Sequence, residues 1–185
     1  MQRVVTWRVI ESAGLETTWV TLDSSSLTAR GRAVGMEPFP YWLEYELTTG
    51  DDYVTRALDV IVHSATDTRT LELRHESGGW TASGDPLPNL SGAVDCDLGL
   101  CPLTNTMPIL RAELHIKPGR HEFLMAWVGV PDLIVRPSRQ IYTHLESASA
   151  GARVRYQSGD FASDLLIDDD GFVVDYPQLA TRIGG

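Results

Sequence analysis

Hydrophobic and polar residues alternate with a period of two along most of the chain. This period is that of a β-strand, because successive side chains of a strand point to opposite faces of the sheet. The alternating segments are rich in β-branched and aromatic residues, and no window has the spacing of an amphipathic helix. We therefore expect an all-β fold. The predicted strands are residues 4–10, 17–22, 27–34, 41–48, 53–63, 69–75, 79–83, 109–117, 120–130, 139–146, 153–158, 162–168 and 172–176.

Two β-hairpins can be aligned from their turn residues. Gly50 and Asp51 suit a two-residue turn with glycine first. This turn places Arg56 on the apolar face of its strand. A guanidinium group buried there needs a charged partner, since leaving it alone would cost about 3 to 5 kcal/mol. The predicted pairs are Leu47 with Val54, Tyr45 with Arg56, Leu43 with Leu58 and Tyr41 with Val60.

The second predicted hairpin turns at Pro118 and Gly119. A two-residue loop at this point keeps one face of both strands apolar and places Arg111 on the polar face. The predicted pairs are Ile116 with His121, Leu114 with Phe123, Ala112 with Met125 and Leu110 with Trp127.

The segment of residues 94–111 is too polar and too broken by proline for an ordinary strand or helix. Asp95 and Asp97 flank one cysteine, and a Thr-Asn-Thr triplet at residues 104–106 lies between two prolines. We expect this segment to cross the interior of the fold and to help form a ligand-binding cavity. The two acids are the predicted partners of Arg56, because they are the least loop-like acids in the chain.

Each of these groups has a structural and a functional interpretation. Arg56 with Asp95 or Asp97 is either a closed ion pair or an arginine that can bind the phosphate or carboxylate of a ligand. Thr104 and Asn105 either hydrogen-bond within their own turn or bind the hydroxyl groups of a sugar or glycerol. The tryptophans, with Tyr41, Tyr45, Tyr142 and Tyr156, either fill the core or line an apolar cavity.

Length and charge narrow the class of protein. A chain of 185 residues fits a single domain, residues 1–185, with a sizeable core. The net charge of −10 argues against nucleic acid and against anionic membrane surfaces as partners. No apolar run is long enough for a signal peptide or a membrane span, so we expect a cytoplasmic protein. We expect Cys96 and Cys101 to be reduced and buried. The histidines are scattered over separate strands, so we predict no metal site, and we predict no cofactor.

Asp-Cys-Asp-Leu at residues 95–98 and Pro-Leu-Thr-Asn-Thr-Met-Pro-Ile at residues 102–109 resemble the signature of the putative glycolipid-binding family. Residues 40–45, 55–56, 69–73, 140–143, 155–156, 165–168 and 171–177 agree with it, so the resemblance covers nearly the whole chain. It implies a single, strongly curved antiparallel β-roll or half-barrel with an internal cavity for a lipid-like molecule. Similar folds are those of bacterial lipoprotein carriers and outer-membrane lipoprotein receptors.

The predicted function is non-catalytic binding of a lipid-like or glycolipid molecule in an internal cavity. The partner is then a small amphipathic ligand, without nucleic acid or stable membrane insertion. The alternative is a hydrolase or isomerase that acts on a small amphiphile, in which Arg56 holds Asp95 or Asp97 in a perturbed protonation state. The predicted ligand-binding residues are Arg56, Asp97, Thr104, Asn105, Arg111, Trp127 and Tyr142.

Overall fold

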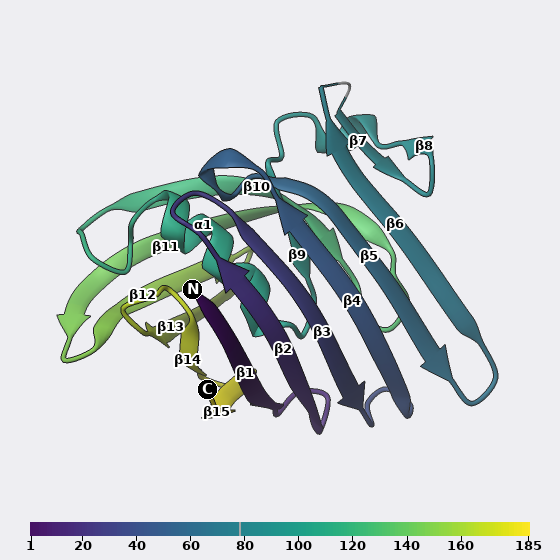
Figure 1. The fold of residues 1–185 in the computed structure, drawn as a ribbon, viewed down its shortest axis with the longest axis horizontal. Coiled ribbons are helices and arrows are strands. Elements are labelled where there is room, and N and C mark those ends of the chain that lie inside the picture. Colours follow the sequence, from purple (N-terminus) through teal and green to yellow (C-terminus); the bar gives the residue numbers. More distant parts are fainter. Residues whose placement is uncertain (78) are drawn as a thin grey trace.

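The structure is a computed structural model that describes residues 1–77 and 79–185. These residues form one mixed β-sheet of fifteen strands (Figure 1). Along the sheet the strands follow the order β8-β7-β6-β5-β4-β3-β2-β1-β15-β14-β13-β12-β11-β10-β9. The strands are β1 (Gln2–Val9), β2 (Gly14–Leu22), β3 (Leu27–Gly35), β4 (Tyr41–Thr49), β5 (Thr55–Ser64), β6 (Thr68–Glu76), β7 (Gly79–Ala82), β8 (Asp85–Pro86), β9 (Asp95–Leu98), β10 (Arg120–Val128), β11 (Val135–Ala148), β12 (Gly151–Ser158), β13 (Phe161–Ile167), β14 (Val173–Tyr176) and β15 (Ala180–Gly184).

The sheet is strongly curved and open, with β8 at one edge and β9 at the other. Neighbouring strands are antiparallel, except that β9 runs parallel to β10. The predicted all-β half-barrel is thus confirmed, with one parallel pair in a sheet that the sequence predicted to be antiparallel throughout. The parallel pair arises because the chain between β9 and β10 crosses the concave side of the sheet before β10 begins.

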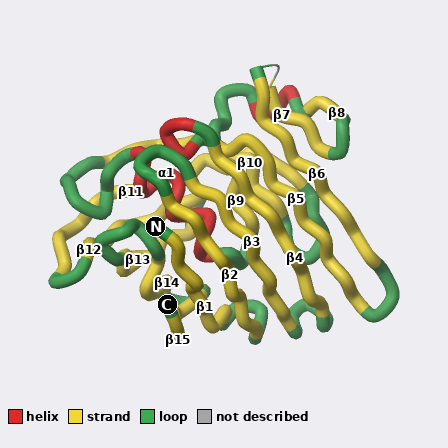
Figure 2. Tube along the Cα trace, viewed as in Figure 1, coloured by secondary structure: helices red, strands yellow, loops and turns green. Residues whose placement is uncertain are grey.

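Residues 102–111 occupy that concave side as a helical turn followed by a short helix (Figures 1 and 2). The chain forms η1 (Asp51–Tyr53), η2 (Pro88–Leu90), η3 (Pro102–Asn105) and α1 (Thr106–Arg111). In Figure 1, α1 lies behind strands β1–β4 and in front of β11–β13. Every residue from Cys101 to Leu110 is buried, which confirms that this segment crosses the interior.

The strand predicted at residues 109–117 and its hairpin are wrong, because residues 106–111 form α1 and turns follow it. Pro102 and Pro108 lack the N–H groups that a sheet needs, but proline is tolerated in the first turn of a helix, where N–H groups have no partner in the helix. A helix of six residues is too short to show a helical period. Strand β10 pairs instead with β9 and β11, so that Trp127 lies opposite Asp97 and Arg136.

The predicted register of the first hairpin is also wrong. The turn includes η1, and Leu47 pairs with Leu58 instead of Val54, a shift of four residues. Because the register shifts by an even number of residues, the residues of β5 that were predicted to face the core still do so over most of the strand. At the start of β5, however, a β-bulge near Thr55 reverses which residues face the core. Thr55 is therefore buried and Arg56 is exposed, so Arg56 does not lie on the apolar face.

Candidate functional site

An open cleft with a volume of about 560 Å³ lies beside the C-terminal half of the sheet. We call it the aromatic cleft, because its walls carry an aromatic side chain from each of β10, β12, β13 and β14. Leu100, Val130 and Leu179 add aliphatic surface. Two carboxylates, which can accept hydrogen bonds, also line the cleft. The aromatic and acidic lining residues are Trp127, Tyr156, Phe161, Tyr176, Glu11 and Glu37.

The rings of the aromatic cleft meet at an angle instead of stacking. The centroid of Tyr156 lies 6.0 Å from that of Phe161 and 5.8 Å from that of Tyr176, at interplanar angles of 63° and 59°. The guanidinium group of Arg136 lies 4.7 Å from the centroid of the Trp127 ring. A side chain at Gly99 would begin 3.3 Å from the same ring, so the glycine leaves room for the indole. The cleft therefore offers aromatic surface for an apolar or sugar-like ligand.

Four of the predicted ligand-binding residues come together behind this cleft. With Gln140 they form what we call the buried network, in which Asp97 is half-buried and the other members are buried: Asp97, Thr104, Asn105, Gln140 and Tyr142. Thr104 Oγ1 donates to Asp97 Oδ1 at 2.9 Å, and Gln140 Nε2 donates to Asp97 Oδ2 at 2.6 Å. The Tyr142 hydroxyl donates to Asn105 Oδ1 at 2.9 Å, with Gln140 Oε1 3.1 Å away.

The polar ends of the buried network find their partners inside the protein, with the single hydrogen of the Tyr142 hydroxyl shared between Asn105 Oδ1 and Gln140 Oε1. Asn105 Nδ2 donates to the carbonyl oxygen of Pro102, so both ends of this amide are engaged. Burial raises the pKa of Asp97, although the hydrogen bonds from Gln140 and Thr104 oppose this shift. The ring of Tyr142 meets the ring of Tyr156 edge to face, with their centroids 5.3 Å apart. Because Tyr156 lines the aromatic cleft, the buried network lies directly behind one wall of this cleft.

The other predicted arginine, Arg111, ends helix α1 and binds Asp95. Both of its terminal nitrogens donate to the carboxylate, with Nη1 2.8 Å from Oδ1. Asp95 is fully buried, and this burial raises its pKa in spite of Arg111. The prediction that Arg56 pairs with Asp95 or Asp97 is therefore wrong. Arg56 instead packs against Gly50, where a Cβ atom would lie only 2.5 Å from its Nε.

A third buried carboxylate, Glu16 on β2, escaped the sequence analysis. Its side chain is fully buried, and its Oε1 accepts hydrogen bonds from the Tyr45 hydroxyl at 2.6 Å and from the Cys101 thiol at 2.8 Å. Tyr45 reaches it across β3 because Gly31 lies under the ring, where a Cβ atom would come within 2.1 Å. Burial raises the pKa of Glu16 to about 7. Within residues 1–77 and 79–185, Oε2 of Glu16 has no hydrogen-bond partner.

The alternation along β2 explains why Glu16 was missed. Leu15 and Trp19 are exposed, whereas Glu16, Thr18 and Val20 are buried. The usual rule, that apolar residues of a strand face the core, would bury Leu15 and Trp19 and expose Glu16 and Thr18. A signal does exist in β3, where Gly31 interrupts the strand, since a glycine within a strand often marks a close approach of another group.

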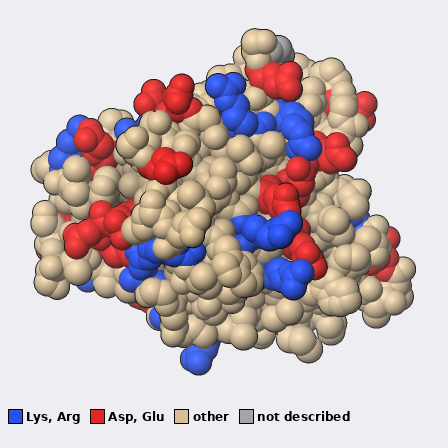
Figure 3. Space-filling view, in the orientation of Figure 1, with Lys and Arg blue, Asp and Glu red and all other residues tan. Residues whose placement is uncertain are grey.

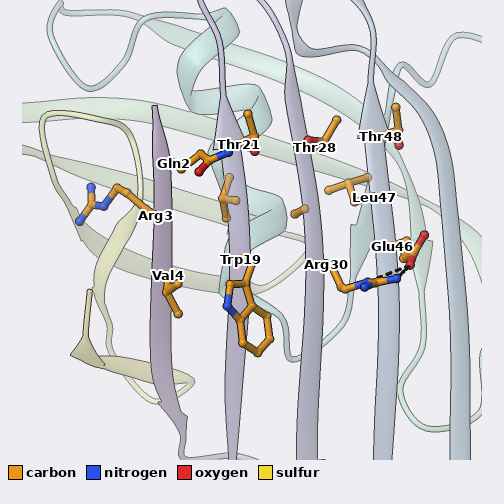
Figure 4. A pocket seen from close by; sticks show the side chains of 12 residues that line it. Gln2, Arg3, Val4, Trp19, Thr21, Thr28, Arg30, Glu46, Leu47 and Thr48 are labelled. Carbon is orange, nitrogen blue, oxygen red and sulfur yellow. Dashed lines mark hydrogen bonds and ion pairs between the residues drawn. The ribbon is translucent and has the colours of Figure 1, made fainter.

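A second hollow, about 580 Å³ in volume, lies on the face of β1–β4 that is turned away from α1 (Figure 4). We call it the outer hollow. Trp19 and Val4 lie side by side in it, and Arg30 forms an ion pair with Glu46 at 2.6 Å. Basic and acidic side chains lie next to one another on this face of the molecule (Figure 3). Its charged groups thus already have partners, and it is the weaker candidate site.

In the described part of the chain, no group of three or more His, Cys, Asp or Glu side chains could hold a metal ion. No helix among these residues has the length and apolar character needed to cross a membrane. Cys96 and Cys101 are buried and free, as predicted.

These features define an open β half-barrel with helical turns on its concave side and an aromatic cleft beside them. The sequence profile of the putative glycolipid-binding family matches residues 4–182, and the chain belongs to this family. A crystal structure of a DUF1089 family protein from Pseudomonas aeruginosa is similar, with 31% sequence identity and a TM-score of 0.75. The match covers 91% of this chain and 92% of that chain. No curated protein matches the sequence.

Proposed function

We propose that this protein binds an amphiphile of the glycolipid type in the aromatic cleft and does not change it chemically. The aromatic lining carries the proposal. The C–H groups on one face of a sugar ring pack well on an aromatic ring, whose face is electron-rich. The same rings, with Leu100 and Leu179, can cover an alkyl chain, and Glu11 and Glu37 can accept hydrogen bonds from hydroxyl groups.

The size of the cleft agrees with this proposal. A volume of about 560 Å³ lies within the range of about 300 to 1,000 Å³ that is usual for small-molecule sites. The enclosed hollow beside Glu16 has a volume of only about 10 Å³, too small for a lipid. We therefore place the ligand in the open cleft, and the internal lipid cavity expected from the sequence stays a prediction.

We do not propose a hydrolase or isomerase, because the arginine and the two acids suggested for catalysis do not come together in a cleft. Arg56 is exposed, Asp95 binds Arg111, and Asp97 accepts hydrogen bonds from Gln140 and Thr104. Neither acid lines the aromatic cleft. We also keep the cytoplasmic location as a proposal, which the free thiols of Cys96 and Cys101 support and cell fractionation would test.

Titration of the purified protein with octyl β-D-glucoside, followed by calorimetry, tests the function. Methyl β-D-glucoside, which lacks the alkyl chain, serves as the comparison ligand. We expect the octyl glucoside to bind more tightly, because its chain covers the apolar part of the cleft. Trp127→Ala should weaken binding at least tenfold, which corresponds to about 1.4 kcal/mol.

The matched control is Trp19→Ala, because Trp19 is a half-exposed tryptophan in the outer hollow. We expect its affinity to equal that of the wild type. A loss of affinity in Trp19→Ala but not in Trp127→Ala would place the site in the outer hollow. A wild-type protein that binds neither glucoside and that carries no extractable lipid after purification would overturn the proposed function.

A further inference from the structure

The unpartnered oxygen of Glu16 is the feature of the core that most needs an explanation. About 90% or more of buried polar groups in proteins have a hydrogen-bond partner, since a buried group without one costs about 1 to 3 kcal/mol. Glu16 Oε1 has two donors, Tyr45 and Cys101, whereas Oε2 has none among the described residues. The hydroxyl and thiol fix the orientation of the carboxylate and leave one oxygen able to accept a hydrogen bond.

A small enclosed hollow lies beside this carboxylate. Glu16, Tyr45 and Cys101 line it, together with Gly99, Leu100 and Val130. Its volume of about 10 Å³ corresponds to roughly one water-sized group. The hollow therefore has room for one hydroxyl group and for nothing larger.

The wall between this hollow and the aromatic cleft is thin. Gly99, Leu100 and Val130 line both spaces. Leu100 has a φ of +63°, in the left-handed region that non-glycine residues rarely adopt. Such strained residues persist where the surroundings hold them, and they are common at ligand sites. A group bound in the cleft against Leu100 is therefore next to the Glu16 hollow.

We propose that the Glu16 hollow is the inner subsite of the aromatic cleft, where one hydroxyl group of the ligand donates a hydrogen bond to Glu16 Oε2. The proposal rests on the function proposed above and specifies which end of the ligand lies deepest. The hydroxylated head group lies against Leu100 and Val130, and the alkyl chain extends along Tyr156 and Phe161 toward the solvent.

A hydroxyl group fits this subsite better than a cation. An ammonium group carries three hydrogens that need acceptors, whereas a space of about 10 Å³ holds one water-sized group, and Oε2 of Glu16 is the lining side-chain atom without a partner among the described residues. A charged group would also have to pass Leu100 and Val130, where its desolvation is unfavourable. A single hydroxyl needs one acceptor and brings no charge, so it matches both the size and the chemistry of the hollow.

The test is carbon-13 NMR of the whole protein labelled at the glutamate side-chain carboxyl carbons. The Glu16 resonance is assigned as the one that is lost in Glu16→Gln, and the probe is octyl β-D-glucoside. We expect the Glu16 carboxyl resonance to shift as the probe binds, together with the indole signal of Trp127. At pH 8.5, where Glu16 with its pKa of about 7 is ionised and Oε2 can only accept, Glu16→Gln should bind the probe at least fivefold more weakly, because it replaces an acceptor oxygen by a donor amide. Glu44→Gln, which alters an exposed acid on the outer face, should bind as the wild type does.

The possible results separate the two proposals. If the Trp127 signal shifts and the Glu16 resonance does not, the inner subsite is refuted and the proposed function stands. If neither signal shifts at saturating probe, both proposals are overturned. The wild-type titration decides the question even if Glu16→Gln fails to fold, because the Glu16 resonance can then be assigned from its shift in Tyr45→Phe.

Discussion

Asp97, which is half-buried, and Glu16, which is fully buried, are carboxylates of one half-barrel, and the short segment from Asp97 to Cys101 connects their surroundings, yet the two sites differ. Both oxygens of Asp97 accept a hydrogen bond from the protein, as do both oxygens of nearby Asp95. Among the residues that the structure describes, only one oxygen of Glu16 has such a partner. A carboxylate in which both oxygens have partners in the protein is already satisfied there, so we assign Asp97 and Asp95 to the stability of the fold. An oxygen left without a partner is available to a ligand.

The largest expected effect is on the free energy of unfolding and concerns the ion pair of Arg111 with Asp95. Arg111→Met should leave Asp95 buried without its cation and destabilise the protein by about 3 to 5 kcal/mol in chemical denaturation at pH 7. Arg56→Met is the matched control, because Arg56 is exposed, and its midpoint should equal that of the wild type. Equal losses in the two variants would show that the Asp95 pair has no special role in stability.

The second effect depends on pH and concerns Glu16. Its pKa rises from 4.5 to about 7 on folding, so between these values the folded protein binds more protons than the unfolded chain. The contribution of Glu16 to stability is therefore fully present below pH 4.5 and is lost as the pH rises to 7, by about 3 kcal/mol in total. Glu16→Gln mimics the protonated side chain.

We therefore expect Glu16→Gln to match the wild type at pH 4.5 and to be more stable by up to about 3 kcal/mol at pH 8. Denaturant titrations across this range measure the difference, in which the contributions of other titrating groups cancel. A constant difference at all pH values would mean that Glu16 titrates normally in the folded protein.

A smaller effect is expected from the buried network. Tyr142→Phe removes the hydroxyl that donates to Asn105 and should cost about 1 to 3 kcal/mol of stability. Its affinity for octyl β-D-glucoside should stay within twofold of the wild type, because the network does not contact the ligand. Tyr53→Phe, whose hydroxyl bonds to Asp23 at the surface, is the control and should change stability less. A large loss of affinity in Tyr142→Phe would assign the network to the binding site.

The smallest effect concerns the outer hollow. Arg30→Gln breaks the exposed ion pair with Glu46, and exposed pairs contribute little in water at physiological salt. We expect an unchanged melting temperature and unchanged probe affinity. A clear loss of affinity would show that the outer hollow takes part in binding.

Strands exposed to solvent on one face could be predicted well from the sequence. In β4, buried and exposed residues alternate from Tyr41 to Thr49 without a break, so the pattern alone gives the strand. The interior location of residues 101–110 was also predictable, from polar residues between prolines. Their helical form was not, because a short buried helix shows no period.

The candidate site was only partly predictable. Trp127 was chosen as a ligand residue and does line the aromatic cleft, and Tyr156 was among the aromatic residues considered for a cavity wall, but Phe161 and Tyr176 were missed as its neighbours. These three neighbours come from β12, β13 and β14, which are adjacent in the sheet, and their meeting depends on a strand order and register that the sequence pattern does not give.

Asp97 and Asn105 were predicted as ligand-binding residues because they are polar residues in a segment expected inside the fold. Polar groups inside a protein need hydrogen-bond partners, however, and here other residues of the protein supply them.

A crystal structure of the protein with octyl β-D-glucoside tests the contrast between the two carboxylate sites most directly. We predict the alkyl chain along Tyr156 and Phe161, the sugar against Leu100, and one hydroxyl oxygen within hydrogen-bond distance of Glu16 Oε2, with the hydrogen bonds of Asp97 unchanged. A sugar that binds Asp97 or Asn105, or one that lies beside Trp19 in the outer hollow, would contradict it.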